Sequence, residues 1–518
     1  MNHRGTETRR KTGEIRNKPP AALEAQRHRG KAHREKPGVR AVCFVSLRVH
    51  CGFNSLLFLL FSVLVFPRCL CASSAAGGEL LRAGAAKVSI TPDVKAQQVP
   101  LGGYAARKGA PATGVHDPVY ARALVLAEGE TKVGIVSVDL CFLPANVAGE
   151  IGKRVQAAGV KGLDAAHLLL CATHTHSAPD PLAMHSGNTF ALKDWPRFDP
   201  KLLAFTAEKI AAAIVEADRR LVPARVGSGS VSAGEWNRNR RGEKLTDPEM
   251  SVLKVTTAEG RPLAAIVNFA AHPTLFDDKW LEISADWPGV MTNAAEKAMG
   301  GEAVCLFLNG AEGDASPNGV DEQPTAEAKV TAYGSELAKI AGGLLGKIET
   351  KAEAPLMAWQ QPVSLPPRKP SAYFVLAAAQ FGVSFQQAKQ FVNGLMPEKT
   401  QLSFAQIGDL LLMGFPCEPT AEIGLAAKAA ARKAGFQHPA IVALTNDWLA
   451  YALTPEQYRA GKYEASMSFY GDQLGPTLLT ALNAGLRRPS AQKERQAFGR
   501  AARLQEFGKV YAVDGIAL

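Results

Sequence analysis

The sequence predicts an α/β fold, a large single domain in which helices cover a mixed and largely buried β-sheet. Two observations predict it. First, short apolar runs of strand length alternate with helical segments, several of which begin at a proline or a capping residue. Second, six of the apolar runs stop at residues able to bind a metal or move a proton. Because ligands of open α/β sheets bind beyond the carboxyl ends of the strands, we expect the active site there, collecting all six ends.

Each predicted strand is followed at once by chemically active side chains. The six strands and the residues after them are 132–138 with Asp139, 168–173 with His174 and His176, 264–271 with His272, 303–308 with Asn309 to Asp314, 410–415 with Glu418, and 440–444 with Asn446, Asp447 and Tyr451. The predicted helices are 146–157, 200–218, 287–299, 327–348, 419–434 and 475–487.

The domain organisation is predicted to be a leader followed by one catalytic domain, residues 78–518. The best candidate for a domain break is the proline-rich segment 366–370, but motifs on both sides of it serve the same site. Residues 1–77 form the leader. A basic region precedes eleven apolar residues, 56–66, and then a run of small residues that ends at Ala76, which is the order of a secretory signal. We therefore expect a secreted, periplasmic or cell-envelope protein, with the leader either cleaved near Ala76 or kept as an anchor.

The net charge of +11 does not indicate a nucleic-acid partner. Residues 1–50 contain 13 Lys or Arg against 4 Glu, which leaves +2 for residues 51–518. Binding to nucleic acid requires basic residues clustered on the folded surface, so we exclude it. Four of the eight cysteines lie in the leader, and Cys141, Cys171, Cys305 and Cys417 read as small buried hydrophobic residues rather than a disulfide framework.

His174 and His176 lie two residues apart at the end of a predicted strand. Because side chains alternate along a strand, both imidazoles can point to the same side of the sheet. Zinc prefers histidine nitrogen and carboxylate oxygen, and catalytic sites leave one position open. A capping or hydrogen-bonding role fits an H-x-H pair about as well. His272, at another strand end, adds weight to the metal interpretation.

Three further candidates also have simpler interpretations. Glu418 could be a first-turn acid favoured by a helix dipole. Tyr451 and Tyr463 could pack as half-buried rings. These residues support a metal site only together with the histidines.

Arg238, Arg240 and Ser316 are similarly ambiguous. The two arginines could belong to a solvated charge run, Asn237–Arg241. Ser316 lies among turn-forming residues, and its surroundings lack the G-x-S-x-G elbow of a serine nucleophile. Spacing alone does not assign a role to any of the three.

Taken together, the motifs resemble the neutral/alkaline non-lysosomal ceramidase family over about residues 83 to 480. The most specific parts are the Thr-His-Thr-His-Ser motif at Thr173, the Gly-Asp-Ala-Ser-Pro-Asn hexapeptide at Gly313, and the Tyr-x-x-Thr-Pro-Glu-x-Tyr segment that starts at Tyr451. Supporting matches lie at residues 102–104, 114–123, 136–139, 237–238, 247–253, 269–272 and 418. The sequence departs from the family pattern at Pro273, Cys417 and Pro419.

The resemblance implies a single zinc ion held by His174, His272, Glu418 and Tyr451. It places substrate contacts on His176, Arg238, Ser316 and Tyr463. We therefore expect zinc-dependent hydrolysis of the N-acyl amide bond of ceramide-like sphingolipids to a sphingoid base and a fatty acid. Zinc would lower the pKa of a water toward about 7 and supply hydroxide for attack on the carbonyl.

In this scheme His176 and Tyr463 stabilise the oxyanion or protonate the leaving amine, while Ser316 and Arg238 position the substrate. A peripheral contact with a membrane surface is a further expectation. Because the sequence ends at Leu518, no C-terminal immunoglobulin-like domain is expected, which leaves the preference for ceramide open. Two alternatives remain: a zinc- or serine-dependent hydrolase of another acyl amide or ester, with Ser316 as the nucleophile in the serine case, and a non-catalytic secreted binding protein.

Overall fold

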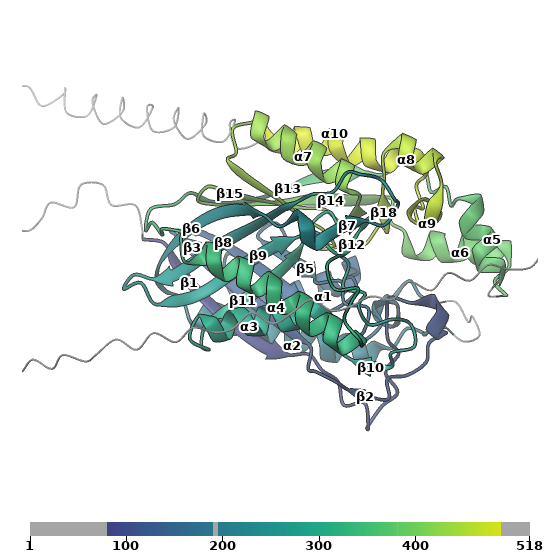
Figure 1. The fold of residues 1–518 in the computed structure, drawn as a ribbon, viewed down its shortest axis with the longest axis horizontal. Coiled ribbons are helices and arrows are strands. Elements are labelled where there is room, and N and C mark those ends of the chain that lie inside the picture. The colour runs from purple at the N-terminus through teal and green to yellow at the C-terminus, as the bar shows by residue number, and fades with distance from the viewer. Residues whose placement is uncertain (1–79, 190–194, 381, 488–518) are drawn as a thin grey trace, which may run out of the picture. The chain divides into compact units, whose positions relative to one another are not determined.

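Two mixed β-sheets form the centre of the structure, a computed structural model that describes residues 80–189, 195–380 and 382–487 (Figure 1). These residues all belong to one compact unit. The leader predicted for residues 1–77 lies outside them. The expected α/β class, with a mixed sheet in a single domain covered by helices, is confirmed.

The larger sheet has eight strands in the order β11-β9-β8-β6-β1-β3-β4-β5. The strands are β1 (Arg82–Ser89), β3 (Tyr120–Glu128), β4 (Thr131–Val138), β5 (Leu168–Ala172), β6 (Val222–Ser232), β8 (Glu249–Thr257), β9 (Pro262–Phe269) and β11 (Val304–Asn309). Only the pairs Arg82↔Pro223 and Ala83↔Val222 join β1 to β6, so two four-stranded halves meet at one corner. The edge strand β11 returns to the other half, where Ser137 of β4 donates a hydrogen bond of 2.6 Å to the carbonyl of Phe307.

The smaller sheet contains β13 (Leu356–Ser364), β14 (Lys399–Ile407), β15 (Leu410–Gly414) and β17 (His438–Val442), in that order. One apolar cluster joins its inner face to the larger sheet, with Ile135 and Ile266 on one side and Leu412 and Val442 on the other. All six predicted strands are confirmed. They form three parallel pairs, β4 with β5, β9 with β11 and β15 with β17, so each pair ends at a shared edge. Strands buried on both faces need near-continuous apolar sequence, which is why these six were recognisable.

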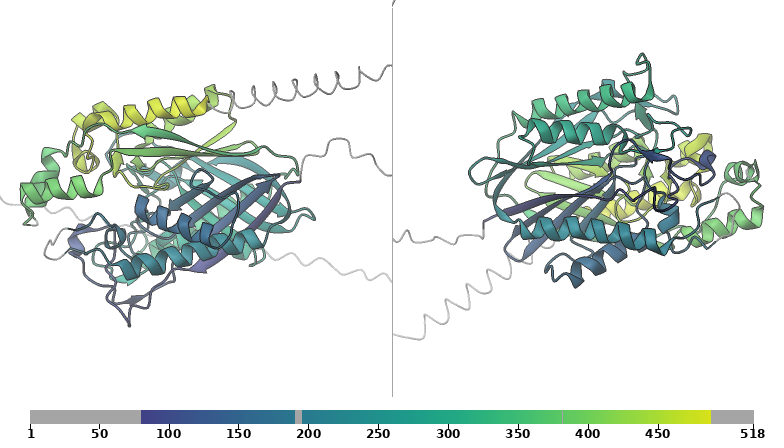
Figure 2. Two further views of the ribbon diagram at one scale, coloured as in Figure 1. Left: turned by 180° about the vertical axis from the view of Figure 1, so that it is seen from behind. Right: turned by 90° about the horizontal axis from the view of Figure 1, so that it is seen from below.

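Helices cover the outer faces of both sheets (Figures 1 and 2). Helices α1 (Ala145–Ala157) and α2 (Pro200–Arg219) pack on the β1-β3-β4-β5 half. Helices α3 (Asp286–Ala298) and α4 (Ala326–Leu345) cover the other half, and α7 (Ala421–Lys433) and α10 (Leu474–Leu486) cover the smaller sheet. The six predicted helices are therefore confirmed, with ends that differ by at most three residues. None of the helices in the described ranges is both long and apolar enough to cross a membrane.

A helical hairpin follows the proline-rich segment and was not predicted. It consists of α5 (Ala372–Gln380) and α6 (Phe385–Leu395), and it stands apart from the sheets at one end of the described unit (Figure 2). The side chain of Ser384 caps α6 through a reciprocal pair of bonds with Gln387. The shorter elements include β2 (Gly114–Val115), β7 (Asn237–Asn239), β10 (Glu282–Ile283), β12 (Ala315–Pro317), β16 (Glu418–Pro419), β18 (Tyr451–Ala452), α8 (Pro455–Arg459), α9 (Lys462–Ser466) and η1 (Ala105–Arg107).

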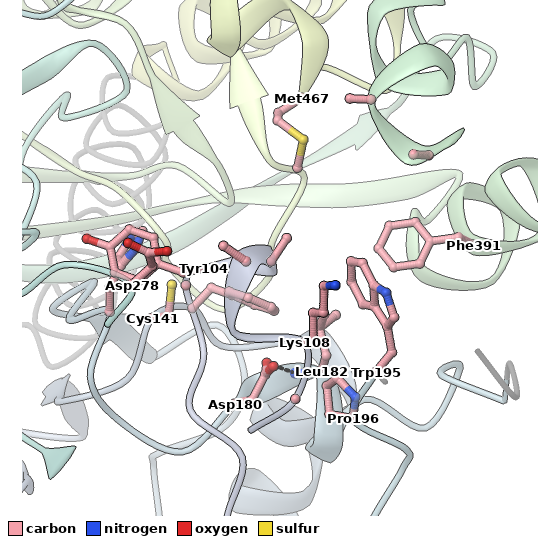
Figure 3. A pocket seen from close by; sticks show the side chains of 18 of the residues that line it. Tyr104, Lys108, Cys141, Asp180, Leu182, Trp195, Pro196, Asp278, Phe391 and Met467 are labelled. Carbon is pink, nitrogen blue, oxygen red and sulfur yellow. Dashed lines mark hydrogen bonds between the residues drawn. The ribbon is translucent and has the colours of Figure 1, made fainter. Parts of the chain in front are cut away.

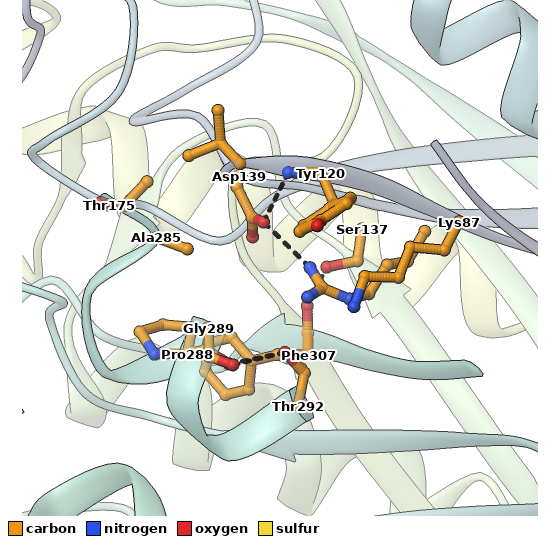
Figure 4. Close-up of polar contacts among 12 residues, drawn as sticks. Lys87, Tyr120, Ser137, Asp139, Thr175, Ala285, Pro288, Gly289, Thr292 and Phe307 are labelled. Carbon is orange, nitrogen blue, oxygen red and sulfur yellow. Dashed lines mark hydrogen bonds and ion pairs between the residues drawn. The ribbon is translucent and has the colours of Figure 1, made fainter. Parts of the chain in front are cut away.

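Asp139, at the end of β4, forms a buried ion pair and does not lie in the crevice that was predicted to collect all six strand ends. Its Oδ2 accepts hydrogen bonds from the Tyr120 amide at 2.8 Å and from Arg122 at 2.9 Å (Figure 4). Arg122 is buried and also pairs with Glu296 of α3 at 3.3 Å. A buried carboxylate needs such a partner, because desolvation otherwise opposes its charge. Asp139 is not among the residues that line the cavity described below, so here the structure differs from the expectation that all six strand ends share one crevice.

Candidate metal centre

The loop after β5 brings His174 and His176 to the carboxyl edge of the sheet. His174 adopts a left-handed backbone conformation with φ 76°, which non-glycine residues rarely adopt and which often marks functional sites. Its Nδ1 donates to the carbonyl of Cys141 at 2.6 Å. Since a carbonyl oxygen only accepts, Nδ1 carries the proton and the Nε2 lone pair is free to bind a cation. The Nε2 atoms of His174 and His176 lie 3.4 Å apart.

His272 follows β9 and is oriented in the same way. Its Nδ1 donates to the carbonyl of Glu312 at 2.7 Å, which fixes the ring and leaves Nε2 as an acceptor. Asn309, at the end of the neighbouring β11, donates from Nδ2 to the carbonyls of Thr173 and Ala271 at 3.2 and 3.1 Å. The side-chain amide of Asn309 thereby links, through these two hydrogen bonds, the chain segments that carry His174 and His272. Burial lowers the pKa of His272 to about 3, so this imidazole is neutral at physiological pH.

Glu418 and Tyr451 are paired through two short parallel strands. Strand β16 lies beside β18 in the register Glu418↔Tyr451, which sets the two side chains next to each other. Trp448 donates from its indole nitrogen to Glu418 Oε1 at 3.1 Å.

The four predicted ligands converge on one point. Glu418 Oε2 lies 3.3 Å from Nε2 of His174 and 3.4 Å from Nε2 of His272. The hydroxyl of Tyr451 is 3.3 Å from the same nitrogen of His272. Ligand atoms of His174, His272 and Glu418 all lie within 4.8 Å of one another.

This cluster fits a divalent cation. With both Nδ1 atoms donating elsewhere, two nitrogen lone pairs face a carboxylate oxygen, and Glu418 Oε2 is buried without a hydrogen-bond partner. Acceptors crowded in this way repel one another unless a positive charge lies between them. Two imidazoles, a carboxylate and a phenol are ligands that suit zinc. The chemistry of the donor set therefore supports the predicted cofactor.

Arg240 lies beside the predicted ligand Tyr451 and contacts its hydroxyl. Arg240 donates to the Tyr451 hydroxyl at 3.0 Å and pairs with Glu464 at 2.8 Å. Burial and the nearby Glu418 carboxylate raise the pKa of Tyr451 well above its usual range, whereas the Arg240 guanidinium opposes that rise. Arg240 is therefore placed to stabilise the phenolate that a bound cation would require.

His176 forms the boundary between the metal cluster and the open space beside it. It is buried, its Nδ1 has no hydrogen-bond partner, and burial together with His174 and His272 lowers its pKa well below 6.5. Gly103, with φ 93°, lets the chain pass close to the ring, because a side chain there would meet His176 Cγ at 2.4 Å. The ring of Tyr104 packs edge-on against His176 at 4.7 Å between centroids.

The other predicted contact residues lie at varied distances from this cluster. Tyr463 lies at the entrance, where its ring packs on Tyr451 with centroids 5.8 Å apart, and it lines the cavity. Ser316 is partly buried in β12, directly after Ala315, whose carbonyl accepts from His272. Arg238 is exposed and pairs with Asp321 at 2.9 Å. Neither Ser316 nor Arg238 lines the cavity, so their role as substrate contacts stays a prediction.

A cavity of about 520 Å³ opens directly from the cluster. His174, His176, Glu418 and Tyr451 form one part of its wall. The rest is mostly apolar and comes largely from the helical hairpin and the segments facing it. Cys141 lies at one end, and Trp195 and Phe391 lie together at the other (Figure 3). Such a space fits an apolar chain whose polar end reaches the histidines.

Several residues of the site were not assigned a role from the sequence. They are Arg240, Glu464, Trp448 and Cys141. Arg240 was noticed but could not be separated from Arg238, since only the fold shows which arginine is buried against Tyr451. Trp448 lies between Asp447 and Tyr451, so the sequence did place it beside a predicted ligand. Glu464 gave no signal of its own.

Comparison with known proteins agrees with this geometry. Residues 81–335 match the sequence profile described as "Neutral/alkaline non-lysosomal ceramidase, N-terminal". The sequence is therefore similar to this family across residues 81–335. It is 25% identical over 471 residues to the neutral ceramidase of Pseudomonas aeruginosa, covering 75% of this chain and 69% of that protein. It is 23% identical over 478 residues to the neutral ceramidase of Drosophila melanogaster, covering 69% and 68%.

The fold is also shared with a ceramidase of known structure. The crystal structure of neutral ceramidase from Pseudomonas aeruginosa superposes with a TM-score of 0.68 at 23% identity, over 81% of this chain and 75% of that one. At this level of identity the superposition shows the fold alone. The family match and the candidate metal centre are the basis for the proposed function.

Proposed function

We propose that this protein is a zinc-dependent amidase that cleaves the N-acyl bond of ceramide-like sphingolipids. One observation carries the proposal: an apolar cavity of about 520 Å³ opens from a buried cluster of His174, His272, Glu418 and Tyr451. A substrate with a long hydrocarbon chain and an amide near its polar end matches that combination. The relatives named neutral ceramidase support the same substrate class.

The metal would be held by the Nε2 atoms of His174 and His272, Glu418 Oε2 and the Tyr451 oxygen. Bound there, zinc would polarise the amide carbonyl and lower the pKa of a water toward neutrality. His174 and His272 remain oriented by their carbonyl partners, and Trp448 holds Glu418 in place.

His176 and Tyr463 would act on the substrate itself. The neutral, buried imidazole of His176 can hold a proton taken from the attacking water and deliver it to the leaving amine. The hydroxyl of Tyr463 can donate a hydrogen bond to the oxygen that becomes negative as the carbonyl is attacked. The apolar wall excludes water and aligns the acyl chain. The products are a fatty acid and a sphingoid base.

A serine hydrolase using Ser316 is less well supported. Within the described residues no histidine forms a hydrogen bond with Ser316, and the cavity does not reach its side chain. A non-catalytic binding protein would retain the cavity and the metal without turnover. Neither alternative requires His176 to face the metal cluster with an unpartnered nitrogen.

The deciding experiment measures metal content and hydrolysis of a long-chain ceramide in parallel. We expect about one zinc ion per chain, release of fatty acid and sphingoid base, loss of both zinc and turnover after chelation, and recovery when zinc is returned. Activity that survives complete removal of metal but disappears in Ser316→Ala would establish the serine mechanism instead. Stoichiometric zinc without hydrolysis of any acyl amide or ester would establish a binding protein.

We also propose that residues 1–77 direct export to the outside of the cell or to the cell envelope. The support is the order of basic, apolar and small residues in this segment. Fractionation of producing cells and N-terminal sequencing of the exported protein test it, with a new N-terminus near Ala76 expected if the leader is cleaved. Protein found only in the cytoplasm with an intact leader would contradict export.

A further inference from the structure

Large apolar side chains are exposed around the helical hairpin. Tyr373 and Leu376 of α5 are 63% and 65% exposed, and Phe385 at the start of α6 is 59% exposed. Tyr463 of the adjacent α9 is 57% exposed. Helix α9 lies against the hairpin, because a side chain at Gly461 would meet the Tyr373 ring at 3.7 Å.

Helix α5 is apolar on both its inner and its outer side. Helix α5 has the sequence Ala-Tyr-Phe-Val-Leu-Ala-Ala-Ala-Gln, yet only Ala378 in it is buried. The inner side, including Phe374, Ala378 and Phe391, lines the cavity. An apolar helix with so little buried surface is typical of one that meets another apolar medium. The exposed surface is thus continuous with the inside of the cavity.

The charge of this segment is entirely positive. Residues 366–397 contain Arg368, Lys369 and Lys389 and no Asp or Glu. Arg368 pairs with Glu398 at 3.4 Å, whereas neither lysine forms an ion pair among the described residues. In the cavity wall, Lys108 lies on the same side as Trp195, while the acidic Asp278 lies beside Cys141 (Figure 3).

We propose that the α5–α6 hairpin is the surface by which this protein docks on a lipid bilayer that contains anionic lipids. Tyr373, Leu376 and Phe385 insert at the boundary between headgroups and acyl chains, and Lys369 and Lys389 contact the phosphates. Because the inner side of the hairpin lines the cavity, an acylated lipid reaches the metal cluster along apolar surface without crossing water. That last step rests on the proposed function, whereas the docking itself does not.

A bilayer fits this surface better than a second protein does. The exposed side chains are aromatic or aliphatic and are flanked by unpaired lysines without any acidic residue, which matches an anionic apolar boundary. An interface between identical copies would place like charges against each other. Self-association through this surface would overturn the proposal.

The apolar leader could also hold the full chain on a membrane, so binding alone does not identify the docking surface. The test therefore measures whether the hairpin itself enters the bilayer. Tryptophan is introduced in separate full-length variants, Leu376→Trp on the hairpin and Leu245→Trp at an exposed apolar position outside it. Vesicles of phosphatidylcholine and phosphatidylglycerol carry brominated acyl chains, which quench tryptophan within the bilayer. We expect the additional fluorescence of Leu376→Trp to be quenched and that of Leu245→Trp to remain.

A second measurement uses Leu376→Ser/Phe385→Ser against the matched pair Val115→Ser/Leu245→Ser. The hairpin variant should bind these vesicles at least about tenfold more weakly, since apolar contact area is lost, and binding of the wild type should fall with salt. The hydrolysis of a short-chain ceramide in solution should be unchanged in both variants.

Equal quenching at positions 376 and 245 would overturn the proposal. So would a concentration-dependent dimer in sedimentation that the hairpin variant abolishes without affecting vesicle binding. Docking without any ceramide hydrolysis would instead contradict only the proposed function.

Discussion

The guanidinium of Arg240 donates a hydrogen bond of 3.0 Å to the hydroxyl of Tyr451. This contact joins a buried cation to a phenol that must lose its proton to bind a metal well. It also separates Arg240 from Arg238, two residues earlier, whose exposed side chain pairs with Asp321. The pair of arginines therefore provides a matched test of the metal centre.

We predict that Arg240→Gln weakens zinc binding by about 10- to 100-fold, the usual effect of removing a residue that orients a metal ligand. Arg238→Gln should retain wild-type zinc affinity, because its guanidinium does not contact a predicted ligand. Competition with a calibrated chelator measures both affinities. Equal affinities in the two variants would show that Arg240 does not support Tyr451.

Replacement of His272 by alanine should remove both zinc and turnover. The change deletes one of the two predicted imidazole ligands and leaves Glu418 Oε2 with a single histidine nitrogen beside it. Elemental analysis and ceramide hydrolysis measure the two losses. His438→Ala is the control, since His438 begins β17 at the edge opposite the cluster. Full zinc content in His272→Ala would refute the ligand assignment.

The buried arginine beneath Asp139 should matter for stability and not for metal binding. Arg122→Leu leaves the buried carboxylate of Asp139 without its cation and Glu296 with Lys87 alone, so we expect a loss of about 3–5 kcal/mol in the free energy of unfolding. Denaturant titration measures the loss. Lys339→Leu, which breaks an exposed pair with Glu336, should change stability by less than about 0.5 kcal/mol. A small loss of stability in Arg122→Leu would mean that water solvates the carboxylates of Asp139 and Glu296.

Asp447 makes stability depend on pH. Burial raises its pKa to about 6. The folded protein therefore holds this proton more tightly than the unfolded chain, where aspartate titrates near pH 3.9. The contribution of protonated Asp447 to the free energy of unfolding is fully present below about pH 4 and is lost as pH rises to about 6. The loss amounts to about 3 kcal/mol at 1.36 kcal/mol per pKa unit.

Asp447→Asn tests this directly. The amide can keep both contacts, accepting from the Trp448 nitrogen and donating to the Thr400 hydroxyl. We expect the variant to be more stable than the wild type above pH 6 and to lack the decline between pH 4 and 6. Thermal unfolding across this pH range measures the difference. Parallel curves for the two proteins would rule out Asp447 as the titrating group.

Narrowing the cavity should affect long acyl chains selectively. Ala377 lines the cavity from α5, whereas Ala379 does not, and both are exposed. Ala377→Phe should raise the KM for a long-chain ceramide by about tenfold or more, because each methylene kept out of an apolar pocket weakens binding by about 1 kcal/mol or more. Short-chain ceramide should be hydrolysed normally. Ala379→Phe should match the wild type on both substrates, and a similar rise in KM there would argue against this position of the acyl chain.

The sequence by itself determined the strands, the covering helices and most residues of the candidate metal centre. Strands such as residues 168–172 and 304–309 are recognisable because burial on both faces requires uninterrupted apolar sequence. The histidines and Glu418 stand out because chemically active residues at strand ends share an edge of the sheet. The family motifs then picked Tyr451 from among many tyrosines.

Only the tertiary structure decided which polar residues meet. Asp139 pairs with Arg122, which is 17 residues away in the chain, and so leaves the common crevice. Arg240 is buried against Tyr451 while Arg238 faces solvent, although both belong to one short charge run. The hairpin at Ala372–Leu395 and its exposed apolar face were likewise not predicted. The physical reason is the same in each case: burial and partner choice depend on contacts between segments far apart in the chain, which local spacing does not encode.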